Sequence, residues 1–238
     1  EGTPVDAYVA TIGPCAGYTL SYPTRVKGME FIVDRLEAGA VIGGGDQWRL
    51  AQNLRHLWAE GHDPFALQLA RARQLGMDYW LQLRMNDWHH WDAIEEDPER
   101  PGLPVGLNLF SSPFYEAHPE NLIGAEGISS YDGERPPAAM QFFQDFRHAE
   151  VRDSRLEVLV ESCERYEADG FQYDFMRIPG FFEIGTEEQH APLMTDLIRR
   201  SRAELDRIGS ARGRRLGFSV RVPGTVAGAR SLGLDVET

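Results

Sequence analysis

The sequence predicts an α/β fold of the TIM (β/α)8-barrel type, with a single, partial barrel domain over residues 1–238. Stretches with the period-2 alternation of strands are separated by stretches with the 3.6-residue period of helices, an order typical of βαβ units and a parallel sheet. The strand expected over 169–177 ends in charged side chains, and in barrel enzymes the carboxyl ends of strands carry the active site. A chain of 238 residues with 42% hydrophobic content suits one core.

Alternating apolar residues predict four strands, which should be parallel and adjacent in chain order. They cover residues 5–12, 78–84, 169–177 and 216–222. Apolar residues at helical spacing predict helices over residues 46–60, 64–75, 151–168 and 191–208. Asp63 and Pro64 supply an N-cap and a first helical proline to the second of these helices.

Four strand–helix units are too few for a closed barrel, which needs eight strands and typically about 250 residues. The segment 88–137 is rich in Pro, Gly, Ser and Asn, and it is expected to be a long loop. This loop takes up length that further units would need. The chain is therefore expected to be part of a larger barrel, and the alternative is a smaller open α/β domain.

Charge and composition exclude several classes of function. The formal net charge of −13 should repel nucleic-acid phosphates. No apolar run approaches the ~18 residues of a membrane span. The glycines 43–45 lack the Lys-Ser/Thr of a phosphate loop, so no cofactor is predicted. Cys163 is expected to be a small core residue of a helix, far from Cys15, and no disulfide or cysteine metal site is predicted.

No signal peptide is expected from the amino terminus, which opens with Glu1 instead of Met. This opening suggests a mature or trimmed product and leaves the compartment open. An extracellular or periplasmic location is compatible with it. The sequence does not indicate an oligomeric state.

The strand over 169–177 places a carboxylate and a guanidinium near its carboxyl end. Asp174 lies close to Arg177, and Pro179 prevents the strand from continuing. Glycosidic cleavage needs an acid that protonates the leaving oxygen and a carboxylate that attacks or activates water. A nearby guanidinium favours the ionised carboxylate, so Asp174 is expected to be the nucleophile or base. The alternative is a structural Asp–Arg ion pair.

The second carboxylate has two candidates within the chain, and a third alternative is that it lies beyond Thr238. Asp87 ends the preceding strand, and Glu183 lies in the loop after Asp174. Arg221, at the end of the strand over 216–222, should reach the same edge or pair with Asp174.

A second group of functional side chains follows the strand over 78–84. Its amide, carboxylate and imidazole groups suit sugar hydroxyls, while a tryptophan offers a flat apolar face to a sugar ring. The expected substrate-binding residues, with two arginines of the other strand ends, are Arg84, Asn86, Trp88, His89, His90, Arg177 and Arg221. One alternative is a loop whose tryptophans pack against the barrel. Another is a metal site of Asp87, His89 and His90, but adjacent histidines rarely both reach one ion, so no metal is predicted.

Several of these segments resemble a known family, the glycosyl-hydrolase-like barrel proteins described as family-10-like glycosidases. The resemblance rests on Arg147–Asp153, Arg165–Gly170, Asp174–Pro179, Leu83–Asp87, Val220–Pro223 and Gly233–Val236, and it extends over most of the chain from Asp63 onward. It implies a TIM barrel that acts on polysaccharide.

Gly170-Phe171-x-x-Asp174 is also similar to a strand motif of α-amylase-like glycosidases, in which the Asp is the nucleophile. Those enzymes carry an Arg two residues before it, where this chain has Gln172.

The leading functional prediction is therefore a glycoside hydrolase that acts on a polysaccharide or oligosaccharide. The alternatives are a carbohydrate-binding barrel without catalysis and a metal-dependent hydrolase that uses Asp87 and His89. In each case Asp174 and the 86–89 segment are expected to meet in one cleft, because the carboxyl ends of parallel strands share one edge.

Overall fold

The computed structural model of the chain describes residues 5–14, 18–42, 44–87, 108–129 and 138–237, with backbone only at 138 and 139. Its centre is a four-stranded parallel sheet in the order β1-β4-β5-β6. The strands are β1 (Ala7–Thr11), β4 (Asp78–Arg84), β5 (Gly170–Asp174) and β6 (Gly217–Arg221). The predicted strands, their parallel direction and their order are confirmed. The described residues form an open α/β sheet, and a closed barrel is not seen among them.

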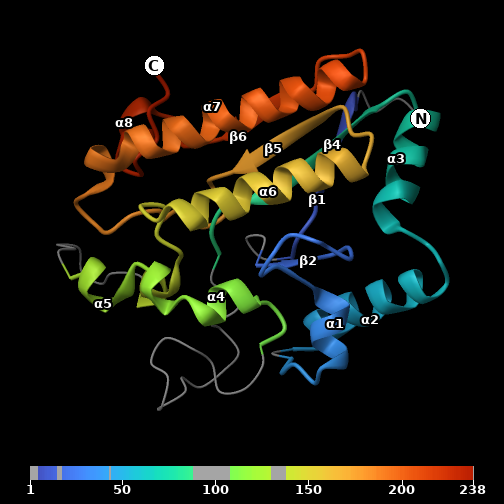
Figure 1. Cartoon of the computed structure of the whole chain (residues 1–238), viewed down its shortest axis with the longest axis horizontal. Coiled ribbons are helices and arrows are strands. Elements are labelled where there is room, and N and C mark those ends of the chain that lie inside the picture. Colours follow the sequence, from blue (N-terminus) through green and yellow to red (C-terminus); the bar gives the residue numbers. More distant parts are fainter. Residues whose placement is uncertain (1–4, 15–17, 43, 88–107, 130–137, 238) are drawn as a thin grey trace.

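Three long helices cover one face of the sheet (Figure 1). They are α3 (Pro64–Gln74), α6 (Ala149–Arg165) and α7 (Glu187–Ala211). The Tyr79 hydroxyl donates to Gln68 of α3, and the Tyr173 hydroxyl lies 3.0 Å from Ser201 Oγ of α7, so these side chains share the helix side. The strand residues of this face in β4 and β5 are fully buried: Tyr79, Leu81, Leu83, Phe171 and Tyr173. Burial of this apolar set is the main stabilising term of the fold.

The opposite face of the sheet, called the open face below, carries the alternate residues of the same strands. Three hydrogen bonds cross it in one row. Thr11 Oγ1 donates to Gln82 Oε1 (2.8 Å), Gln82 Nε2 to Gln172 Oε1 (2.6 Å), and Gln172 Nε2 to Ser219 Oγ (2.9 Å). This row satisfies the side-chain amides and links all four strands.

Two further rows flank these hydrogen bonds on the open face. Toward the amino ends of the strands, the Trp80 indole lies against Gly170 and Gly217, where an added Cβ would collide with it. Toward the carboxyl ends, Arg84, Asp174 and Arg221 are in register across β4, β5 and β6. The open face therefore places a charged row at the carboxyl edge of the sheet.

The helix predictions are confirmed in type and shift at their ends. α2 (Gly45–Ala59) and α3 match the expected ranges, and the Asp63 side chain accepts hydrogen bonds from Phe65 N and Ala66 N as an N-cap. α6 begins before residue 151 and ends before residue 168, the two limits of the predicted helix. α7 contains Pro192 and extends beyond both ends of the predicted range 191–208. Instead of a plain loop, the described part of 88–137 holds the short helices α4 (Pro113–Ala117), η1 (Pro119–Asn121) and α5 (Gly124–Gly127).

A second, smaller core lies between α1 (Ile32–Glu37), α2 and residues 109–110. At its side Arg35 is 1% exposed and ion-pairs with Glu30 and Glu116. The remaining elements are β2 (Thr19–Leu20), β3 (Glu30–Phe31), η2 (Ala138–Phe142) and α8 (Val226–Arg230).

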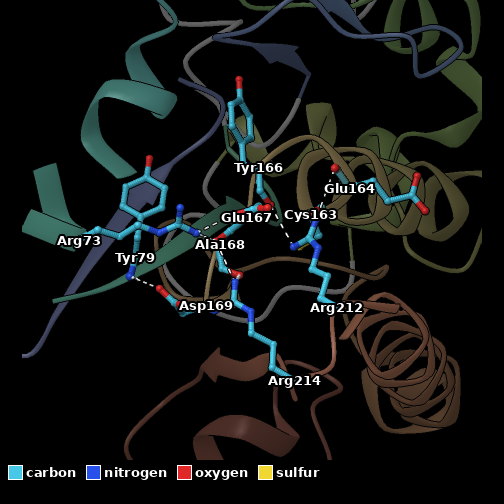
Figure 2. A network of polar contacts seen from close by, with 10 residues as sticks. All are labelled: Arg73, Tyr79, Cys163, Glu164, Tyr166, Glu167, Ala168, Asp169, Arg212 and Arg214. Atoms are coloured by element: carbon cyan, nitrogen blue, oxygen red, sulfur yellow. Dashed lines mark hydrogen bonds and ion pairs between the residues drawn. The ribbon is translucent and has the colours of Figure 1, made fainter. Parts of the chain in front are cut away.

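At the opposite end from the charged row, an arginine closes the carboxyl terminus of α6 (Figure 2). Arg212 donates through Nη1 to Tyr166 O (3.3 Å) and through Nη2 to Cys163 O. These carbonyls belong to the last turn of a helix, where no backbone partner remains. Cys163 is a buried core residue of α6, as predicted.

Arg214 ties the next residues to the start of β5 (Figure 2). Its Nη2 donates to Glu167 O and Ala168 O, each at 2.9 Å, and its Nη1 pairs with Asp169. The other carboxylate oxygen of Asp169 accepts from Tyr79 N at 2.9 Å. This end of the sheet therefore stabilises the joint between α6 and the strands.

Candidate functional site

Asp174 is the last residue of β5, and its side chain is almost completely buried. Its Oδ2 lies 3.1 Å from Arg221 Nη1 at the end of β6, and its Oδ1 accepts a hydrogen bond from Met176 N (2.9 Å). That turn ends the strand at Asp174, three residues before the predicted end. The cation that pairs with Asp174 is therefore Arg221 from the neighbouring strand, whereas Arg177 is exposed.

Asp87 lies just beyond the end of β4 and is fully buried. Arg84 Nη1 is 3.3 Å from Asp87 Oδ2 and also donates to Pro14 O (3.0 Å). Met85 N donates to Asp174 O (3.0 Å), so the residues that follow β4 run directly beside the end of β5. Asp174 and Asp87 consequently lie at the same edge of the sheet, as predicted, and each has an arginine beside it.

Asn86 is buried, and protein groups engage both atoms of its amide. Its Nδ2 donates to Gln144 O (2.9 Å) and Gly180 O (2.6 Å), while its Oδ1 accepts from the Tyr18 hydroxyl (2.8 Å). The amide thus joins the end of β4 to three other segments. The sequence predicted a contact with substrate for this residue, and the structure places it in a linking position.

Arg155 supports the same turn from inside α6. Its Nη2 donates to Gln144 Oε1 (2.7 Å) and, with Nε, to Met85 O (3.4 Å each). The rings of Tyr18 and Phe146 lie 5.4 and 5.8 Å from the guanidinium carbon, an arrangement that gives cation–π attraction. Complete burial lowers the pKa of Arg155 from its usual value. Sequence reasoning missed this residue. The available signal was its position four residues after Val151, which places an arginine among the apolar residues at helical spacing that predict α6.

Glu183 lies in the loop after β5, as expected, but its carboxylate is engaged elsewhere. Arg147 Nη2 lies 2.8 Å from Glu183 Oε1 and 3.3 Å from Asp145 Oδ2. Burial raises the pKa of Asp145, and the Arg147 backbone and side chain oppose this shift. The structure therefore brings Glu183 to Arg147 and Asp145, while Asp174 is joined to Arg221.

Trp88, His89 and His90 lie outside the described residues, so their expected contacts with a sugar or a metal stay predictions. Within the described ranges, no group of three His, Cys, Asp or Glu side chains is arranged to hold a metal ion. No described helix combines the length and apolarity needed to cross a membrane.

Taken together, the described geometry defines an α/β protein with two buried carboxylates and two arginines at the carboxyl edge of a parallel sheet. No family model matches this chain, and no curated protein matches it. Five chains of solved structures match. One is the galactosidase domain of an alpha-galactosidase-sucrose kinase, AgaSK, with a TM-score of 0.35 and 18% sequence identity. The match covers 75% of this chain and only 21% of that one, and the likeness is too distant to assign an activity.

Proposed function

We propose that this chain carries the active site of a glycoside hydrolase that acts on a polysaccharide or oligosaccharide. The observation that supports this proposal is the placement of Asp174 and Asp87 at one edge of adjacent parallel strands. Catalytic groups of α/β barrels come from the carboxyl ends of their strands. Glycosidic cleavage requires two carboxyl groups that flank the bond.

Glycosidic cleavage needs one carboxylate and one carboxylic acid, so Asp174 and Asp87 are assigned different roles. Arg221 Nη1 and Met176 N both stabilise negative charge on Asp174, which suits a nucleophile or a base. Asp87, fully buried beside Arg84, is assigned the role of proton donor, with Glu183 as the alternative. The side chain of Arg221 is 57% exposed and that of Arg84 is 25% exposed, so both can also reach sugar hydroxyls.

The direct test is a screen of a glycan panel for new reducing ends, followed by single substitutions. Asp174→Asn preserves shape but removes the charge, and it should lower turnover by about 10²- to 10⁴-fold. Asp153→Asn, at a half-exposed residue of α6 that pairs with Arg200 of α7, is the matched control and should leave turnover unchanged. Near-full activity of Asp174→Asn would remove the assigned role.

The same assay assigns the remaining residues. Loss of turnover in Asp87→Asn, with activity retained in Glu183→Gln, supports Asp87 as the acid, and the reverse supports Glu183. Trp88→Ala should raise KM with little change in kcat, because it removes a stacking surface and no reacting group.

A second candidate function is carbohydrate binding without cleavage. It is favoured by the depth of both carboxylates, since Asp174 is 2% exposed and Asp87 is fully buried. Calorimetric binding of a glycan that the wild-type chain does not cleave would support this candidate. Turnover that a chelator abolishes would instead support a metal-dependent hydrolase that uses Asp87 and His89.

A further inference from the structure

We propose that Asn121, Asp145 and His148 form an internal water site, in which ordered water joins the Asn121 amide to the Asp145 carboxylate. The proposal concerns a buried binding site, and it does not depend on the function proposed above.

The Asn121 side chain is the first sign of this site. Asn121 is completely buried, and no described residue forms a hydrogen bond with its Oδ1 or its Nδ2. Burial of an amide without hydrogen bonds is unfavourable, and almost all buried polar groups of folded proteins are bonded to protein or to ordered water. The Asn121 amide therefore indicates a partner other than the described protein groups.

Asp145 lies opposite Asn121 and carries a second unpaired atom. Leu122 and Gln144 form an antiparallel bridge, and next to it Asp145 N donates to Asn121 O at 2.7 Å. Residues paired in this way have Cα atoms about 5.5 Å apart. Asp145 is also completely buried, and its Oδ2 accepts no hydrogen bond from the described part of the chain. The amide and the carboxylate thus start from neighbouring backbone positions without bonding to each other.

His148 supplies a third polar atom. Its backbone N–H donates to Asp145 O (3.2 Å), and its Nε2 is buried without a hydrogen bond to any group in the described ranges. Burial raises the pKa of the Asp145 carboxyl, and His148 is among the groups that oppose this shift. A hydrogen bond to His118 lowers the pKa of Glu120, the neighbour of Asn121, and His148 adds to that effect. The His148 ring is therefore within electrostatic range of both segments of the site.

Water matches these three groups in size and in hydrogen bonding. A water molecule that bridges two polar atoms spans about 5.5 Å, the sum of two hydrogen bonds of about 2.8 Å. An internal water typically makes about three hydrogen bonds to otherwise unpaired groups. It can accept from the Asn121 amide and donate to Asp145 Oδ2, and His148 Nε2 completes the set.

Charge and burial argue against other occupants. Arg147 Nη2 lies 3.3 Å from Asp145 Oδ2, so its positive charge would repel a metal ion bound to this oxygen. The unpaired atoms of Asn121, Asp145 and His148 are shielded from solvent, so a sugar cannot reach them.

The water site lies beside two contacts of the candidate functional site. Gln144, the neighbour of Asp145, accepts through its backbone oxygen from Asn86 Nδ2 after β4. Arg147 joins Asp145 to Glu183 in the loop after β5. Water that links the segment at Asn121 to the segment at Asp145 therefore stabilises the position of both contacts.

A high-resolution crystal structure tests the proposal directly. It should show ordered water about 2.8 Å from both the Asn121 amide and Asp145 Oδ2. A direct bond between these two side chains, a protein group inserted between them, a metal ion or a dry gap would each overturn the proposal.

In solution, the sign of a stability change separates bridged from unbridged groups. Asn121→Leu keeps a similar volume but removes both polar atoms. If water joins the amide to Asp145, this substitution leaves Asp145 Oδ2 unpaired, and Tm should fall by about 2–8 °C. An unchanged or higher Tm would show that the amide is bonded to nothing and would overturn the proposal. Asn53→Leu, at an exposed position of α2, is the matched control and should change Tm by less than about 2 °C.

Oxygen-17 relaxation dispersion, which reports long-lived internal water, separates a loss of water from a loss of packing. The Asn121→Leu variant should hold less long-lived water than the wild-type chain, and Asn53→Leu should match the wild type. Circular dichroism confirms that each variant is folded. Equal amounts of long-lived water in the wild type and in folded Asn121→Leu would overturn the water site.

Discussion

The carboxylate of Asp174 and the guanidinium of Arg221 lie 3.1 Å apart, although 47 residues separate them in the sequence. The parallel pairing of β5 with β6 places the two residues opposite each other at the ends of their strands. The acceptor is buried and the donor is largely exposed, with side-chain exposures of 3% and 57%. This asymmetry determines how the pair should respond to substitution.

Loss of Arg221 should cost more stability than the ion pair itself contributes. Arg221→Met leaves the Asp174 carboxylate buried without its cation, and the free energy of unfolding should fall by about 1–3 kcal/mol. Combined with Asp174→Asn, the pair should show a coupling energy of about 1 kcal/mol in urea denaturation, because solvent screens the exposed guanidinium. Strictly additive effects would show that the two side chains do not interact.

Gly217 should not tolerate a side chain while Trp80 is present. A Cβ at this position would collide with the indole, so Gly217→Ala should lower the free energy of unfolding by about 1–3 kcal/mol. Gly224→Ala is the control, because no atom lies within 4 Å of its added Cβ. Trp80→Leu should recover part of the loss in the Gly217→Ala background. A thermal denaturation series measures all of these variants.

Arg212 should contribute more to stability than Arg207, which lies five residues earlier in the chain. It satisfies carbonyls at the end of α6, so Arg212→Met should lower the free energy of unfolding by about 1–2 kcal/mol. Arg207→Met removes only surface ion pairs with Glu164 and Glu204 and should cost less than about 1 kcal/mol. Equal losses in chemical denaturation would contradict a capping role for Arg212.

Cys163 should be unreactive in the folded protein. Burial raises the pKa of its thiol to about 12, so very little thiolate is present at pH 8. The same burial prevents a thiol-specific reagent from reaching the sulfur. In a Cys15→Ser variant, labelling by a thiol-specific disulfide reagent should be negligible in buffer and complete in denaturant. Rapid labelling in buffer would show that α6 is not packed against the sheet as described.

Asp145 should make stability depend on pH in a definite direction. Burial raises its pKa in the folded state above the usual value of 3.8, so the folded state binds the proton more tightly. Between 3.8 and the raised pKa, stability therefore falls as pH rises, and it stays lower at higher pH. Asp145→Asn cannot titrate but keeps an oxygen for Arg147 N, so its stability relative to wild type should increase with pH. A pH-independent difference in urea denaturation between pH 3 and 8 would contradict this assignment.

Local sequence patterns were sufficient for the strands, most helices and the capping of α3. A period of two or 3.6 residues reports which side of an element is buried, and the Asp63-Pro64 pair acts within one turn of helix. The parallel order of the four strands also followed from the sequence, because helical connections join neighbouring strands with one handedness. The common edge of Asp174 and Asp87 is a consequence of that order.

The partners of the charged residues were decided by tertiary structure. The sequence offered both Arg177 and Arg221 as partners of Asp174, and Arg221 forms the ion pair because strand register brings together residues that are far apart in the chain. Glu183 pairs with Arg147 because the loop after β5 lies against the segment before α6, where Phe146 N donates to Phe181 O. Arg155 lies within an apolar helical stripe, and only packing against Met85 O shows what it binds. Periodicity depends on neighbouring residues alone, whereas these contacts depend on how separate elements are placed against one another.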